Sequence, residues 1–239
     1  MSATLLFRDD AYLKDCAATV TAVNDKGGIL LDRTVFYATA GGQPGDKGTL
    51  AWDGGNVTIA TTVYDETKDV VHVPAEGQTL PSVGAKVTPT LDWSNRYRNM
   101  RAHTLMHLLC ASVPFPVTGG AIGEDGGRID FDIPEGQIPD KADLTATLNR
   151  LVTEDHPVSF RWITDEEMAE HQHLIRTMSV KPPTGTGRVR LVMIGEDGKV
   201  DLQPCGGTHL SSTGAIGPVV VSKIENKGKI NRRIRVAFQ

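Results

Sequence analysis

The first part of the chain alternates short apolar runs with turn residues. Val, Ile and Thr are concentrated in four stretches, at residues 18–25, 27–38, 56–65 and 69–75, and Gly, Asp and Asn separate these stretches. β-Branched residues favour extended backbone, and short strands at this spacing are typical of a small barrel or sandwich. The pattern therefore predicts an N-terminal β-barrel-like domain over residues 1–92.

The apolar period changes at Trp93, where a helical pattern begins. One stripe at spacings of three and four carries Met100, His103, Met106, His107 and Cys110. Ser94 is a candidate N-cap for this helix, and Pro114 and Pro116 end it. The stripe predicts a helix with two histidines on one face.

Further elements follow in the second part of the chain. A helix is predicted over residues 141–157. A third helix is predicted over residues 164–178, beginning at Thr164, where Glu167 completes a capping-box signature. Strands are predicted at residues 188–195 and 199–203, and a closing hairpin at residues 218–238, with its turn around Lys227 and Gly228. We therefore predict the fold class α+β, with a second domain over residues 93–239.

Composition and charge narrow the class of protein. The formal net charge is −4, so contact with nucleic acid has to come from a local patch. Three cysteines do not make a disulfide framework, which indicates a reducing compartment. The short apolar run at the N-terminus is interrupted by Arg8, Asp9 and Asp10, and no stretch reaches the roughly 18 apolar residues of a membrane span. We expect a cytoplasmic protein with no membrane contact.

Two pairs of metal-ligand types lie four residues apart. His103 and His107 project from one face of the predicted helix, and Cys205 and His209 flank two glycines in QPCGGTHL. Three imidazoles and one thiolate suit Zn²⁺ in tetrahedral geometry. Each pair alone is as well explained by packing or by a tight turn, but together the pairs predict a zinc site.

Other cysteines and histidines are weaker candidates. Cys110 follows His107 by three residues and could compete as a ligand, but a buried core thiol is the better interpretation. The remaining histidines lack comparable partners, so we expect them at the surface; they are His72, His156, His171 and His173.

The stretch GGQPGD, at residues 41–46, is unusual. Gly41 and Gly42 would let the main chain approach a ligand closely, and the amide of Gln43 could orient an ester or a water molecule. GGQ is similar to the tripeptide with which release factors open the peptidyl-tRNA ester. The alternative is a wide turn between two strands.

Positive charge gathers in the closing hairpin. Its basic residues are Lys223, Lys227, Lys229, Arg232, Arg233 and Arg235, against Glu225 alone. Such a face is either solvated or binds a phosphate backbone. We predict that Lys229, Arg232 and Arg233 contact the phosphates of a nucleic acid.

In combination, HTLMHLL, GGQPGD and QPCGGTHL resemble the AlaX family, free-standing relatives of the alanyl-tRNA synthetase editing domain. The resemblance covers nearly the whole chain and is closest to the medium-length members. It implies a zinc-dependent trans-editing hydrolase that releases Ser or Gly from tRNA(Ala), whose acceptor end is its partner; no dedicated protein partner is evident. By position, His103, His107, Cys205 and His209 match the zinc ligands, and Thr118 matches the threonine that bonds the serine hydroxyl.

The resemblance also implies an active site to which Gly41 and Gly42 contribute substrate contacts, with Gln43 and Thr118 as the catalytic candidates. The long members' C-terminal extension and a synthetase catalytic core are not recognised in this sequence. Two alternatives stay open: a non-catalytic zinc-containing RNA-binding module, and a deacylase of a different mischarged tRNA.

Overall fold

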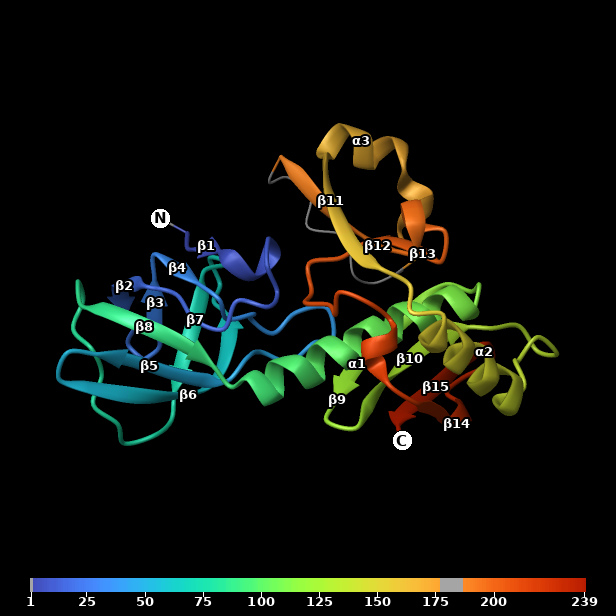
Figure 1. Ribbon diagram of the computed structural model, residues 1–239, viewed down its shortest axis with the longest axis horizontal. Coiled ribbons are helices and arrows are strands. Elements are labelled where there is room, and N and C mark those ends of the chain that lie inside the picture. Colours follow the sequence, from blue (N-terminus) through green and yellow to red (C-terminus); the bar gives the residue numbers. More distant parts are fainter. Residues whose placement is uncertain (1, 177–186) are drawn as a thin grey trace. The chain divides into compact units, whose positions relative to one another are not determined.

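The computed structural model describes residues 2–176 and 187–239, which form two compact units, Met1–Asn99 and Met100–Gln239 (Figure 1). The division lies within helix α1 (Trp93–Ser112). The first unit is a closed β-barrel, and the second combines two antiparallel sheets with helices. The predicted fold class, α+β with an N-terminal barrel, is confirmed.

Six antiparallel strands close the barrel of the first unit (Figure 1). In sheet order they are β2 (Ala18–Val23), β3 (Ile29–Leu31), β7 (Val70–Pro74), β6 (Gly55–Tyr64), β5 (Gly48–Trp52) and β8 (Lys86–Leu91). A short parallel pair, β1 (Thr4–Leu5) and β4 (Arg33–Thr34), lies outside this ring. Apolar side chains such as Phe36, Leu50 and Ile59 fill the interior. The strands β5 and β8 were not predicted; Pro89, which removes a backbone donor, obscured the alternation of β8.

His72 lies inside the barrel, so the prediction that it is a surface residue was wrong. Its side chain is fully buried on β7, with Nδ1 3.0 Å from the carbonyl oxygen of Ile29 and Nε2 2.8 Å from Oγ1 of Thr34. A carbonyl only accepts, so Nδ1 carries the hydrogen and Nε2 accepts from the threonine hydroxyl. Burial lowers the pKa of His72 to about 4, and the imidazole is therefore neutral.

The second unit contains a four-stranded sheet in the order β14-β15-β10-β9. Its strands are β9 (Val117–Gly123), β10 (Gly126–Asp132), β14 (Val219–Asn226) and β15 (Asn231–Phe238). Strands β14 and β15 form the predicted closing hairpin, whereas β9 and β10 were not predicted. Helix α2 (Lys141–Thr153) is tied to β14, because the side-chain amide of Asn149 donates to the carbonyl of Val219 and accepts from its N–H.

A three-stranded sheet, β11-β12-β13, completes the second unit. It comprises β11 (Val158–Thr164), which the pattern missed, β12 (Arg188–Ile194) and β13 (Asp201–Pro204). One face packs Ile163, Val189 and Leu191 against Met168 of helix α3 (Asp165–Glu170). Strand β13 runs directly into the CGGTH segment and therefore positions it.

The helix starts follow capping chemistry. Thr164 and Glu167 make the predicted capping box of α3. The helix is shorter than expected and is followed by a 3-10 turn at Gln172–Leu174. Residues 177–178 of the expected helix lie outside the described residues. The cap of α1 is Asp92 and not Ser94, since Oδ1 of Asp92 accepts from the N–H of Asn95. Within the described residues, no helix has the length and apolar character needed to cross a membrane.

Candidate functional site

Helix α1 supplies the first half of the candidate metal site. His103 and His107 lie one turn apart on this helix, and both imidazoles are buried. Leu105, Leu108 and Leu109 anchor the helix in the core with no exposed surface. A helix held by buried leucines fixes the direction of both histidines, which is what a preformed ligand pair requires.

The segment after β13 supplies the second half. The N–H of Cys205 donates to the carbonyl of Arg190 on β12, and the guanidinium of Arg190 in turn donates to the carbonyls of Cys205 and Gly207, at 3.2 and 3.1 Å. The same guanidinium stacks on the ring of Phe160. The loop that carries Cys205 and His209 is therefore held by contacts with the sheet.

The two halves meet in one cluster. The ligand atoms of His103, His107, Cys205 and His209 all lie within 4.8 Å of one another. Sγ of Cys205 is 3.5 Å from Nε2 of His103 and 3.4 Å from Nε2 of His209. Tetrahedral zinc, with Zn–S near 2.3 Å and Zn–N near 2.0–2.1 Å, sets sulfur–nitrogen separations of about 3.6 Å. The cluster can thus hold a tetrahedral metal ion with little movement of its side chains.

The electrostatics of the cluster favour a thiolate. Burial alone would raise the pKa of Cys205, but interactions with the neighbouring imidazoles of His103, His209 and His107 lower it well below 9.0. Burial, and next the charge of His103, lower the pKa of His209 well below 6.5. A thiolate and a neutral imidazole are the forms in which these side chains bind metals.

A second layer of polar residues supports the ligands. Oδ2 of Asp201 lies 2.7 Å from Nδ1 of His107, and Nε2 of Gln203 donates to both carboxylate oxygens of Asp201. Burial by itself would lower the pKa of His107, but hydrogen bonds to Asp201 and Cys205 raise this pKa to about 10. Thr104 approaches Nδ1 of His209 at 3.4 Å. Sequence reasoning missed this layer; its one signal was an acidic residue, Asp201, in a strand ending at a ligand.

Cys110 is not part of the cluster. Its side chain is buried in the core, and burial raises the pKa of its thiol to about 12. A thiol with this pKa stays protonated and is a poor metal ligand. The interpretation of Cys110 as a core thiol is confirmed.

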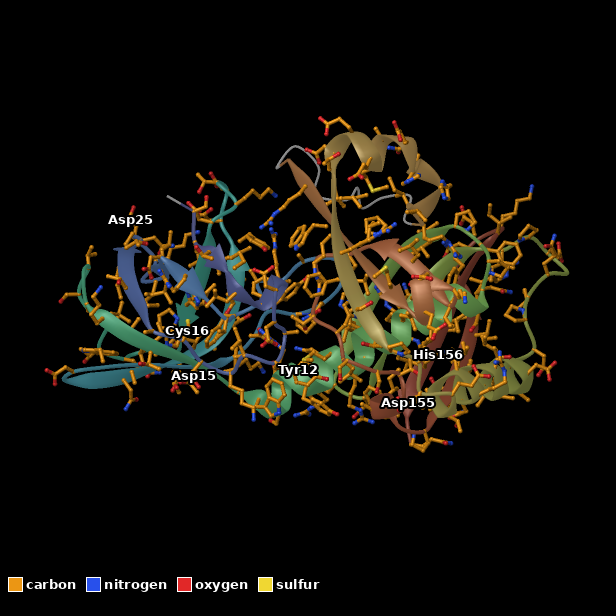
Figure 2. All side chains as sticks on the ribbon, turned by 45° about the horizontal axis from the view of Figure 1, so that its top comes forward. Tyr12, Asp15, Cys16, Asp25, Asp155 and His156 are labelled. Atoms are coloured by element: carbon orange, nitrogen blue, oxygen red, sulfur yellow. The ribbon has the colours of Figure 1, made fainter. Side chains whose placement is uncertain are left out.

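The three remaining histidines also lie outside the cluster. His171 and His173 are exposed, as predicted. His156 is half-buried, adjacent to Asp155 (Figure 2), and its Nε2 lies 2.8 Å from Oε2 of Glu154. It therefore has an acidic partner that the sequence pattern did not suggest.

Thr118 lies on β9, where its hydroxyl makes two described contacts. It donates to the carbonyl of Asp130 on β10, at 3.1 Å, and accepts from Nδ2 of Asn231 on β15, at 2.6 Å. The side chain is part-buried, so three strands fix the direction of the hydroxyl. Its predicted contact with a serine substrate stays a prediction.

The GGQ segment forms a tight turn, which differs from the wide turn considered as the alternative. Ala40 and Gln43 exchange backbone hydrogen bonds, and Gly41 and Gly42 between them have φ of 55° and 83°. Two positive φ angles are the mark of a type I′ turn, which glycine adopts without strain. Both glycines are exposed, whereas Gln43 is fully buried. The backbone of the glycines, and not the amide of Gln43, is what this turn presents.

The predicted tRNA-binding residues differ in their surroundings. Arg232 is buried, and its guanidinium donates to the carbonyls of Gly228, Lys229 and Asn231. The guanidinium of Arg233 pairs with the carboxylate of Asp130 at 2.8 Å, and Lys229 is exposed. Arg232 therefore shapes the β14–β15 turn and is badly placed for a phosphate, which corrects that part of the prediction.

Comparison with known proteins relates the chain to tRNA synthetases and to alanyl-tRNA editing proteins. Residues 6–95 match the family described as tRNA synthetases class II (A), and residues 189–235 match the threonyl and alanyl tRNA synthetase second additional domain. The chain is 32% identical to the alanyl-tRNA editing protein AlaX-M of Methanosarcina acetivorans, covering 96% of both chains. It is 34% identical to AlaX-M of Methanosarcina mazei, over 94% of this chain and 92% of the relative.

A longer relative is also similar. The alanine–tRNA ligase of Pyrobaculum neutrophilum is 35% identical over 92% of this chain, which spans 25% of the ligase. The similarity to the AlaX-M proteins, in contrast, runs through both units and nearly the full length of each relative. The chain belongs to the AlaX family of alanyl-tRNA editing proteins.

Proposed function

We propose that this protein is a zinc-dependent hydrolase that deacylates Ser-tRNA(Ala) and Gly-tRNA(Ala) and spares Ala-tRNA(Ala). The observation that carries the proposal is the cluster of His103, His107, Cys205 and His209 in a chain similar to editing proteins over 96% of its length. The protein would act in trans on tRNA already released from a synthetase, in the cytoplasm, where translation draws on charged tRNA.

Selection between amino acids explains why such an activity is needed. A synthetase pocket shaped for alanine cannot strongly reject glycine, and serine adds only a hydroxyl. A second site can instead require that hydroxyl, because a buried polar group is left without a partner when alanine is bound. Thr118 is our candidate for the residue that contacts the serine hydroxyl, and the contacts with Asp130 and Asn231 hold its own hydroxyl in place.

The donor set fits zinc better than a hard cation. Thiolate and imidazole suit Zn²⁺, whereas Mg²⁺ and Ca²⁺ prefer oxygen ligands. A zinc ion held by the four residues would supply Lewis-acid chemistry at the ester or hold the amino group of the substrate. The chain's own contribution is to orient His107 through Asp201 and to keep Cys205 in its thiolate form.

Residues outside the cluster are our candidates for holding the tRNA. Gly41 and Gly42 expose backbone without a side chain and would contact the aminoacyl end of the tRNA. Gln43, if it acts on the ester, has to do so from a buried position, which makes a supporting role for its amide the simpler assignment. Lys229 and Arg233 remain our candidates for contacts with phosphates.

A panel of mischarged tRNAs tests the proposal. Purified protein would be incubated with Ser-tRNA(Ala), Gly-tRNA(Ala), Ala-tRNA(Ala) and Ser-tRNA(Thr), and deacylation rates compared with those of a Cys205→Ser variant. We expect hydrolysis of the first two only. Hydrolysis of Ser-tRNA(Thr) alone would favour a different editing substrate, and binding without hydrolysis of any tRNA would favour a zinc-containing RNA-binding module.

A further inference from the structure

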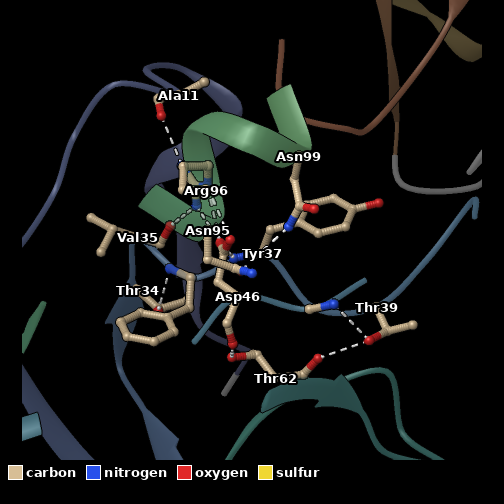
Figure 3. A network of polar contacts seen from close by, with 12 residues as sticks. Ala11, Thr34, Val35, Tyr37, Thr39, Asp46, Thr62, Asn95, Arg96 and Asn99 are labelled. Atoms are coloured by element: carbon tan, nitrogen blue, oxygen red, sulfur yellow. Dashed lines mark hydrogen bonds and ion pairs between the residues drawn. The ribbon is translucent and has the colours of Figure 1, made fainter. Parts of the chain in front are cut away.

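A buried ion pair joins Arg96 to Asp46, which follows the glycine turn in the chain (Figure 3). The guanidinium of Arg96, at the start of α1, contacts the carboxylate of Asp46, with Nε 3.0 Å from Oδ2, and the two side chains are 0% and 1% exposed. Arg96 also donates to the carbonyls of Ala11 and Val35. A buried guanidinium with all these acceptors has one geometry, so the carboxylate of Asp46 is fixed in space.

Asp46 passes this constraint to the segment that carries the turn. Its Oδ2 accepts from the N–H of Tyr37 at 2.7 Å, and its own N–H donates to the carbonyl of Tyr37 at 2.9 Å. The hydroxyl of Thr62 donates to the carbonyl of Asp46. Tyr37 and Asp46 thus clamp the two ends of the segment, and the phenol of Tyr37 donates to the carbonyl of Ala40, next to the turn.

The middle of the segment is packed equally closely. The N–H of Thr39 donates to the carbonyl of Thr62, and the N–H of Gly45 donates to Oγ1 of Thr39, both at 2.9 Å. A Cβ on Gly45 would lie 1.9 Å from the carbonyl oxygen of Thr62, so no other residue fits there. The base of the turn therefore has no room to move.

The apex of the turn at Gly41, in contrast, is not closely packed. A Cβ on Gly41 would meet nothing within 4 Å, although its φ of +55° is one that most side chains rarely adopt. Among the described residues of the barrel, none fills the space next to this glycine. A rigid base under a bare, exposed backbone is the arrangement expected of a surface built to be approached by a ligand.

We propose that Asp46 and Arg96 are positioning residues, which hold the Gly41–Gly42 turn as a preformed backbone surface for the aminoacyl end of the tRNA. The proposal rests on the proposed function. Neither side chain touches the substrate, because both are buried. They keep the turn ordered before the substrate arrives. The entropic cost of ordering the turn therefore does not add to the free-energy barrier of the reaction.

The ion pair is tested first with Asp46→Asn and Arg96→Lys. Amide hydrogen exchange should rise about tenfold or more across residues 39–46 and stay unchanged in the β5–β6 hairpin. Leu50→Ala, which removes a buried barrel side chain away from this network, is the control for general loss of stability. The Asp46 variant should lower kcat for Ser-tRNA(Ala) about tenfold at nearly unchanged KM, and Arg96→Lys should retain more activity than Arg96→Met because it keeps the charge.

The turn itself is tested with Gly41→Asn, since asparagine tolerates positive φ. Gly77→Asn is the matched control, because Gly77 is also exposed, has φ of +73° and would place its Cβ in open space. We expect both variants to fold alike and only Gly41→Asn to lose about tenfold or more in kcat/KM. Equal activities of the two variants, or unchanged exchange at residues 39–46 in Asp46→Asn, would overturn the proposal. If the wild type hydrolyses no mischarged tRNA, the proposed function fails, and hydrogen exchange alone decides whether the ion pair holds the turn.

Discussion

Oδ2 of Asp201 lies 2.7 Å from Nδ1 of His107, which makes the carboxylate a direct partner of one residue of the candidate metal site. The contact fixes the tautomer of His107, so that Nε2 faces the other three ligands. Asp201→Asn should weaken zinc affinity about 10- to 100-fold, as measured by competition with a chromogenic chelator. Asp197→Asn is the control, because it makes the same substitution at an exposed turn; an equal loss in both variants would contradict the assignment.

Loss of the thiolate should release the metal. We expect about one equivalent of zinc per chain in the purified protein and loss of most of it in Cys205→Ser, since a serine hydroxyl remains protonated. Metal analysis after exhaustive dialysis gives the content. Cys16→Ser serves as the control, because Cys16 is half-buried in the barrel unit and outside the cluster (Figure 2). Full retention of zinc in Cys205→Ser would rule out the four-residue site.

Thr118 should read the hydroxyl of serine. Thr118→Val keeps the shape and should reduce hydrolysis of Ser-tRNA(Ala) by roughly 1–3 kcal/mol, a five- to 150-fold loss, with far less effect on Gly-tRNA(Ala). The variant also removes the contacts with Asp130 and Asn231, which lowers the stability of the protein and therefore affects hydrolysis of both substrates alike. The ratio of the two rates cancels that effect. Equal losses on both substrates would mean that Thr118 supports the pocket without reading its contents.

The basic hairpin should separate into binding and structural residues. Lys229→Ala should make the negative slope of log K against log salt less steep by about 1 in tRNA-binding titrations, because a phosphate contact is lost. Arg232→Ala should instead lower the free energy of unfolding by about 1–3 kcal/mol, since three backbone carbonyls lose a buried donor. An unchanged salt slope in Lys229→Ala would mean that this residue is only solvated.

The barrel should lose stability in mild acid. The pKa of His72 is lowered from 6.5 to about 4, first of all by burial, so the unfolded chain binds more protons between these values. The contribution of His72 to the free energy of unfolding is about 3 kcal/mol. It is fully present above pH 6.5 and is lost as the pH drops toward about 4. Urea unfolding at several pH values measures it. His72→Gln should flatten this dependence and His171→Gln, an exposed control, should leave it intact.

Local spacing was enough to predict each of the two residue pairs that form the candidate metal site. Two residues four apart on a helix share a face whatever surrounds them, and the CGGTH segment brings its two ligands together within one short loop. The same reasoning predicted the closing hairpin and the capping box of α3, because turns and caps depend on neighbouring residues. The β-branched stretches likewise predicted the barrel, although β5 and β8 were missed.

Contacts between distant residues decided the rest. Asp201 meets His107 across 94 positions and Arg96 meets Asp46 across 50, distances over which no sequence period carries information. The same holds for burial: His72 was expected at the surface and Arg232 in contact with phosphate, yet the fold encloses both and gives them carbonyl partners. A polar side chain's role depends on which groups satisfy it once water is excluded, and only the packed chain determines that.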